Sequence, residues 1–74
     1  MRVLVSDPVA AEGVEILRGG ADVDVITGLT REELIARIKE YDGLVVRSET
    51  KVTAEVIQAA ERLKVIARAG VGVD

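Results

Sequence analysis

The sequence contains no cysteine and no histidine. Without cysteine, the chain cannot form disulfide bonds, thiolate nucleophiles or cysteine-ligated zinc sites. Without histidine, it lacks the side chain that most often serves as a general acid or base near neutral pH, and a common metal ligand. We therefore expect neither a metal site nor a catalytic residue within these 74 residues.

Aromatic side chains and long apolar runs are also scarce. Tyr41 is the single aromatic residue, and no apolar run approaches the roughly 20 residues of a membrane span. Charges of both signs are scattered along a chain of net charge -3, so neither a basic patch nor a base-stacking platform is present. The opening apolar stretch is too short for the core of a signal peptide. We expect a cytoplasmic protein that binds neither nucleic acid nor a membrane.

Small branched aliphatic residues dominate what remains. The hydrophobic share is 49%, and it consists almost entirely of valine, isoleucine, leucine and alanine. Such a composition is typical of buried parallel sheets. A chain of 74 residues makes at most one small domain, and domains of this size bury only about 60% of their unfolded surface.

Four short apolar runs predict strands at residues 2–5, 23–26, 43–46 and 65–67. Helical patterns separate them, which gives the order β-α-β-α-β-α-β and predicts a parallel sheet. We expect the flavodoxin-like strand order 2-1-3-4, with the Rossmann order 3-2-1-4 as the alternative. A complete flavodoxin-like domain would add one more helix and strand, so we expect an incomplete sheet in which the fourth strand is an exposed edge.

Polar residues mark the start of each predicted helix. Asp7 precedes Pro8 and is expected to cap the first helix, which runs to about residue 17. Thr30 and Glu33 have the spacing of a capping box, and Thr53 is expected to cap the third helix. The apolar faces of the first and third helices are expected to include Ile16 and Ile57, respectively.

Candidate binding residues follow the third and fourth strands. Arg47 and Ser48 come directly after the third, and Arg68 comes directly after the fourth. Ligands of open parallel sheets bind outside the carboxyl ends of the strands, and guanidinium groups bind carboxylate and phosphate through paired hydrogen bonds. This placement favours a two-arginine anion site. The alternative for Arg47 is a surface ion pair with Glu49 or another nearby acid.

The segment Gly70-Val71-Gly72 is not interpreted as a dinucleotide fingerprint, because a lone G-x-G is a weak signal and the third glycine, the helix and the distal acid of that pattern would all lie beyond residue 74. It is interpreted either as a tight turn or as a loop whose backbone N–H groups approach an anionic oxygen.

Two stretches of the chain resemble a known family. The segments Val45–Thr53 (VVRSETKVT) and Leu63–Asp74 (LKVIARAGVGVD) are similar to the amino-terminal part of the NAD-dependent D-2-hydroxyacid dehydrogenases, in particular those that act on 3-phosphoglycerate. The resemblance covers essentially the whole chain and implies a flavodoxin-like substrate-binding domain. It also implies that NAD and the catalytic histidine belong to a nucleotide-binding domain beyond residue 74.

The resemblance assigns substrate-binding roles to four residues. Arg47 and Arg68 match positions that help to hold the anionic substrate, and Val71 and Gly72 match a segment whose backbone amides meet its carboxylate. Ser48, directly after Arg47, is also expected to bind the substrate. Three hypotheses follow for residues 1–74. They form a partial substrate-binding domain, inactive alone and unable to bind NAD; they self-associate through the exposed sheet edge as a homo-oligomer; or they form a weak module for small anions.

Overall fold

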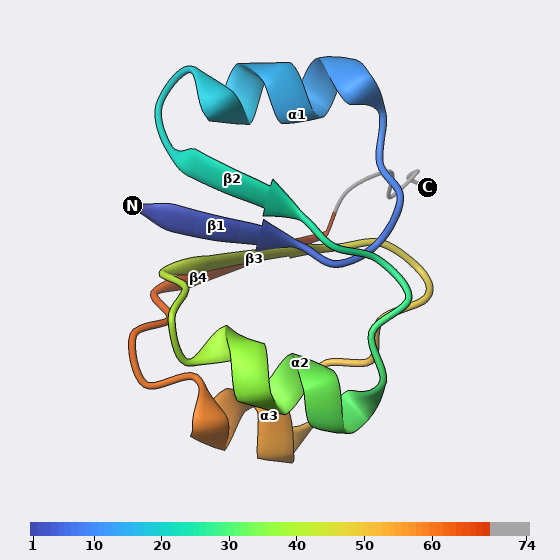
Figure 1. Ribbon diagram of the computed structural model, residues 1–74, viewed down its shortest axis with the longest axis vertical. Coiled ribbons are helices and arrows are strands. Elements are labelled where there is room, and N and C mark those ends of the chain that lie inside the picture. Colours follow the sequence, from blue (N-terminus) through green and yellow to red (C-terminus); the bar gives the residue numbers. More distant parts are fainter. Residues whose placement is uncertain (69–74) are drawn as a thin grey trace.

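The computed structural model describes residues 1–68 and shows a four-stranded parallel sheet between two layers of helices (Figure 1). The elements in chain order are β1 (Arg2–Val5), α1 (Ala11–Arg18), β2 (Asp22–Val25), α2 (Arg31–Ile38), β3 (Gly43–Val46), α3 (Ala54–Ala59) and β4 (Val65–Arg68). The strands lie in the order β2-β1-β3-β4, which confirms the flavodoxin-like prediction over the Rossmann alternative. The second strand begins one residue earlier than predicted, and the fourth includes Arg68.

The two central strands, β1 and β3, are buried on both faces, which explains their continuous apolar sequences. Side chains that alternate along them enter two separate clusters. The larger cluster lies between the sheet and helices α2 and α3 and consists of Leu4, Leu34, Ile38, Tyr41, Leu44, Val46 and Val56. The smaller one consists of Val3, Val5 and Val45, with Leu17 of α1 packed against it.

The capping predictions hold for two of the three helices. Thr30 Oγ1 accepts a hydrogen bond from the Glu33 N–H at 3.1 Å, and the Glu33 carboxylate accepts one from the Thr30 N–H at 2.8 Å. Thr53 Oγ1 accepts from the backbone at the start of α3. The prediction for Asp7 was wrong: α1 begins at residue 11 after Ala10, which makes no side-chain cap. Asp7 does not cap α1 because loop residues after β3 occupy its carboxylate.

The predicted inward faces of α1 and α3 also need correction. Ile16 is 78% exposed and Ile57 is 53% exposed, whereas Val14 and Val56 are buried. Each residue advances about 100° around a helix, so Ile16 lies about 200° from Val14 and faces away from the sheet. Ile57 lies about 100° from Val56, at the margin of the packed face.

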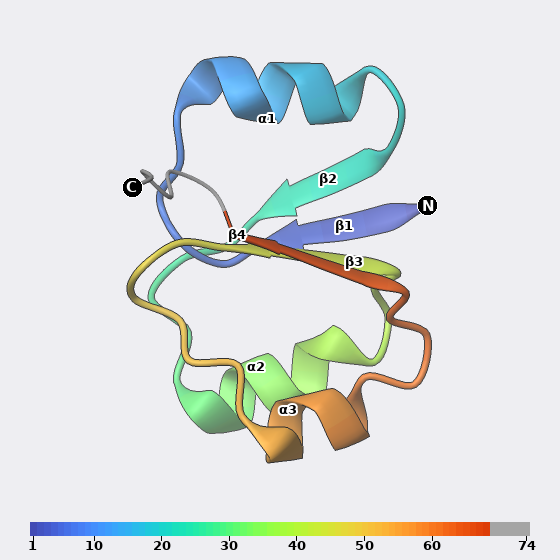
Figure 2. The same ribbon diagram turned by 180° about the vertical axis from the view of Figure 1, so that it is seen from behind.

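The two edges of the sheet differ. On the β2 side, α1 lies above the strands, while α2 and α3 lie on the opposite face (Figure 1). Strand β4 forms the other edge (Figure 2), and all four of its residues are exposed, including Val65 at 50% and Ile66 at 42%. None of the helices in residues 1–68 has both the length and the apolar character needed to cross a membrane.

A polar cluster joins β1, β2 and the end of α2 at the amino end of the central strand. The Tyr41 hydroxyl donates to Asp24 Oδ2 at 2.6 Å, and Arg2 Nη2 donates to the same oxygen at 3.2 Å. The Arg2 guanidinium also lies 4.7 Å from the centre of the Tyr41 ring and pairs with Glu40 at 3.1 Å. The hydrogen bond from Tyr41 lowers the pKa of the Asp24 carboxyl, and Arg2 adds to this effect.

Candidate anion-binding site

Arg47 and Arg68 lie together at the carboxyl ends of β3 and β4. The register of these parallel strands pairs Val46 with Arg68, so Arg47 follows directly beside that position. Arg68 Nε donates a hydrogen bond to the Arg47 carbonyl oxygen at 3.3 Å. The strand order therefore brings the two predicted binding arginines to one rim of the sheet.

The guanidinium groups at this rim are accessible. Arg47, Ser48 and Arg68 are all exposed, and within residues 1–68 neither arginine forms an ion pair. The alternative in which Glu49 neutralises Arg47 is thus not the arrangement observed. Val71 and Gly72, the remaining predicted binding residues, lie outside the described residues.

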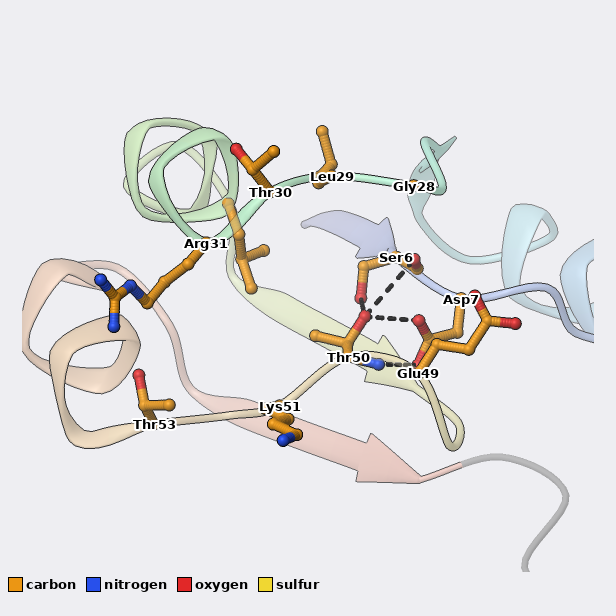
Figure 3. A pocket seen from close by; sticks show the side chains of 11 residues that line it. Ser6, Asp7, Gly28, Leu29, Thr30, Arg31, Glu49, Thr50, Lys51 and Thr53 are labelled. Atoms are coloured by element: carbon orange, nitrogen blue, oxygen red, sulfur yellow. Dashed lines mark hydrogen bonds between the residues drawn. The ribbon is translucent and has the colours of Figure 1, made fainter.

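Asp7 also lies at this rim, and its prediction as a helix cap missed the role that it has there. It is only 1% exposed and lies two residues after the end of β1. Its Oδ2 accepts hydrogen bonds from the Arg47 N–H at 2.7 Å and the Thr50 N–H at 2.9 Å, and its Oδ1 accepts from the Thr50 hydroxyl. Ser6 Oγ lies 2.9 Å from the same hydroxyl oxygen (Figure 3). One buried carboxylate therefore holds the loop that carries Arg47.

These hydrogen bonds change the pKa of Asp7. Burial alone would raise the pKa, because it disfavours the charged form. The hydrogen bonds from the Thr50 hydroxyl and from the backbone of Arg47, Thr50 and Glu49 together outweigh burial and lower the pKa below its usual value. Asp7 is consequently an ionised carboxylate at neutral pH, with its lone pairs occupied by donors of the protein.

A cavity of about 410 Å³ lies next to this rim, between the loops that follow β1, β2 and β3 (Figure 3). Its lining residues are Ser6, Asp7, Gly28, Leu29, Thr30, Arg31, Leu34, Glu49, Thr50, Lys51 and Thr53. Arg47, Ser48 and Arg68 are not among them. Arg31 pairs with Glu55 at 3.4 Å, and the capping box at the α2 N-terminus occupies the Glu33 N–H. Lys51 also lines the cavity, together with the carboxylates of Asp7 and Glu49. Unlike the rim, the cavity does not bring together two arginines without ion pairs in residues 1–68.

Gly28, with φ 74°, is the one glycine of left-handed conformation in residues 1–68, and it precedes the α2 N-terminus, where the capping box occupies the Glu33 N–H. The same part of the chain contains no group of three or more acidic residues arranged to hold a metal.

Residues 3–74 match the family described as D-isomer specific 2-hydroxyacid dehydrogenase, catalytic domain. The chain belongs to this family. The resemblance inferred from the segments around Arg47 and Arg68 is thereby confirmed.

Relatives similar to this chain include D-3-phosphoglycerate dehydrogenases. The enzyme of Archaeoglobus fulgidus is 56% identical over 75 aligned positions, which cover 100% of this chain and 14% of the relative. That of Methanocaldococcus jannaschii is 57% identical over 74, with the same coverage. The chain thus spans about one seventh of the length of these relatives.

Solved structures agree with the fold of the 2-hydroxyacid dehydrogenase chain. A Pyrococcus horikoshii protein superposes with a TM-score of 0.85 at 42% identity and covers 90% of this chain and 20% of its own. The 3-phosphoglycerate dehydrogenase of Entamoeba histolytica, solved with bound NAD+, superposes with a TM-score of 0.79 at 36% identity. It covers 100% of this chain and 27% of its own.

Proposed function

We propose that this chain forms part of the substrate-binding domain of an NAD-dependent phosphoglycerate dehydrogenase. The longer protein would oxidise 3-phosphoglycerate to 3-phosphohydroxypyruvate, a step of serine biosynthesis, with NAD and the catalytic histidine held outside residues 1–74. The names of the relatives support the substrate, and the absence of histidine supports a role in binding rather than in proton transfer. The two arginines at one rim carry the proposal.

In this proposal Arg47 and Arg68 bind the phosphate or the carboxylate of the substrate. The contact from Arg68 Nε to the Arg47 carbonyl holds the Arg68 side chain beside the Arg47 backbone and leaves the terminal nitrogens of Arg68 without a partner in residues 1–68. Two exposed guanidinium groups without ion pairs suit a doubly charged ligand. Ser48 adds a hydroxyl beside them, and the backbone of Val71 and Gly72 would contribute amides.

Titration with 3-phosphoglycerate, followed by NMR amide shifts, tests this assignment. We expect weak, saturable binding, since half of the ligand stays in water without an opposing domain. Arg47→Ala and Arg68→Ala should abolish it. Arg18→Ala is the matched control, because Arg18 is also exposed but pairs with Glu15 on α1. Equal affinity for all three variants would contradict the assignment, and no binding at millimolar ligand would remove the idea of an independent anion module.

A second candidate role is self-association through the β4 edge. Ile57, Val65 and Ile66 are each at least 42% exposed, and they line a groove of about 250 Å³ between α3 and β4. An unpaired apolar edge strand is a template for pairing with another strand, so a second copy would bury this surface.

Sedimentation velocity across a concentration series tests the second candidate. Ile66→Lys places a charge on the β4 edge and should shift the distribution toward monomer. Ile16→Lys is the matched control, because Ile16 is 78% exposed on α1, remote from that edge. A wild-type chain that stays monomeric from micromolar to millimolar concentration would contradict self-association.

A further inference from the structure

We propose that Asp7 and Thr50 act as positioning residues for the anion site, by holding the loop from which Arg47 projects. This inference rests on the proposed function, because it concerns how the same site is assembled. We call the three hydrogen bonds between Asp7 and the Arg47–Thr50 loop the Asp7 latch. Neither latch residue is assigned a contact with the ligand.

The latch fixes both ends of a four-residue loop with one carboxylate. The N–H of Arg47, the first residue, and the N–H of Thr50, the last, meet on the same oxygen at 2.7 Å and 2.9 Å. The Thr50 hydroxyl binds the other oxygen. With both ends held, the exposed residues between them have little freedom to change the direction of the loop.

The peptide unit at Arg47 is restrained from two sides. Asp7, which follows β1, accepts from its N–H, while Arg68, which ends β4, donates to its carbonyl oxygen at 3.3 Å. These contacts join residues 40 and 21 positions apart in the sequence. Residues from β4 and from the loop after β1 therefore restrain the backbone of Arg47 together. Its guanidinium group stays exposed and can reach a ligand.

The chemistry of Asp7 favours positioning over direct participation. The side chain is 1% exposed, and hydrogen bonds from three donors already occupy its oxygens. A carboxylate close to an anion site repels the anion, and the dipoles of the three donors to Asp7 offset part of that repulsion. Bonds to a carboxylate are shorter and stronger than bonds to a neutral acceptor, so an aspartate holds the loop more firmly than an uncharged residue would.

Two variants of Thr50 distinguish the effect of its hydroxyl hydrogen bond from the effect of side-chain shape. Thr50→Val keeps the shape but removes the hydroxyl, whereas Thr50→Ser keeps the hydroxyl. Hydrogen bonds to charged groups are worth enough to change an equilibrium by about tenfold or more. In NMR titrations of the full chain with 3-phosphoglycerate, we expect Thr50→Val to bind about tenfold more weakly and Thr50→Ser to restore binding close to the wild-type value.

The ligand-free protein provides an independent readout. The amide resonances of Arg47 and Thr50 should move together as Asp7 titrates in acid, and Thr50→Val should displace the Arg47 resonance while the far-UV circular dichroism spectrum stays unchanged. A wild type that shows no binding at millimolar ligand would overturn anion binding by the 74-residue chain, and with it the positioning role, but would leave the family assignment intact. Unlinked amide titrations would overturn the latch itself. Wild-type affinity in Thr50→Val, or no rescue by Thr50→Ser, would overturn its positioning role.

Discussion

Removal of the Tyr41 hydroxyl is the most direct test of how the polar cluster stabilises the fold. In Tyr41→Phe the ring stays in the larger core cluster, and Asp24 loses only the 2.6 Å hydrogen bond. A hydrogen bond to a charged acceptor contributes about 1.5–3 kcal/mol. The Asp24 side chain is 46% exposed and keeps its contact with Arg2, so water and Arg2 compensate for part of the loss. We expect destabilisation of about 1 kcal/mol, below that range.

Such a change is measurable in a domain of this size. A loss of about 1 kcal/mol lowers the midpoint of thermal unfolding by roughly 4–8 °C in a small domain. Urea unfolding followed by far-UV circular dichroism should give a lower midpoint with an unchanged slope, since the core stays intact. The free energy of unfolding of a small domain is about 0.05–0.15 kcal/mol per residue, so a loss of about 1 kcal/mol is a substantial part of the total.

A double-mutant cycle with Asp24→Ala assigns the effect to the Tyr41–Asp24 bond. If that bond is the cause, Tyr41→Phe should cost little once Asp24 is absent, and the coupling energy should be about 1 kcal/mol. The coupling should also fade in acid. Asp24 has a lowered pKa in the folded state, so its contribution is complete above the unfolded value of about 3.9 and is lost as the pH falls through the folded value. Equal costs of Tyr41→Phe with and without Asp24 would refute this account.

Three further predictions concern pH, backbone conformation and activity. Asp7 also has a lowered pKa when folded, so its contribution to stability is complete above about pH 3.9 and is lost as the pH falls through the folded value. Asp7→Asn should therefore reduce the loss of stability in acid, measured as urea midpoints between neutral and acidic pH. An unchanged loss would contradict the role of the Asp7 hydrogen bonds. Gly28→Ala should cost about 1–2 kcal/mol because φ is 74°, whereas Gly20→Ala, in open space without a positive φ, should be tolerated; equal unfolding midpoints would contradict this. The 74-residue chain should not reduce NAD in the presence of 3-phosphoglycerate, because it contains no histidine for proton transfer; turnover above that of Arg47→Ala would contradict this expectation.

Local patterns were sufficient to predict most of the fold. The strands around Leu4 and Leu44 are short and apolar on both faces, which identifies a parallel sheet, and the capping box of Thr30 and Glu33 locates the start of α2. The strand order then places Arg47 and Arg68 at one rim. These features depend on residues close in sequence or on rules of chain connection.

The role of Asp7 could not be predicted from its neighbours. An aspartate before a proline has the local signature of a helix cap, and the donors that compete for it are 40 and 43 residues away. The useful signal was the position of Ser6 and Asp7 directly after a buried strand, where a polar side chain must find partners from adjacent loops. Ile16 was misplaced because the apolar residues of α1 do not share one face: Val14 is buried and Leu17 packs against the smaller cluster, whereas Ile16 lies about 200° from Val14.

The restraint of Arg47 by Asp7 and Arg68 has a consequence for the order of folding. Contacts between residues 7, 47 and 68 close long loops, and loop closure costs chain entropy. We therefore expect these contacts to form only after β1, β3 and β4 have docked. Within residues 1–68, no single helix–strand unit brings these three residues together. Hydrogen exchange at the Arg47 amide should therefore follow global opening of the domain, and a partly folded chain would lack the proposed anion site.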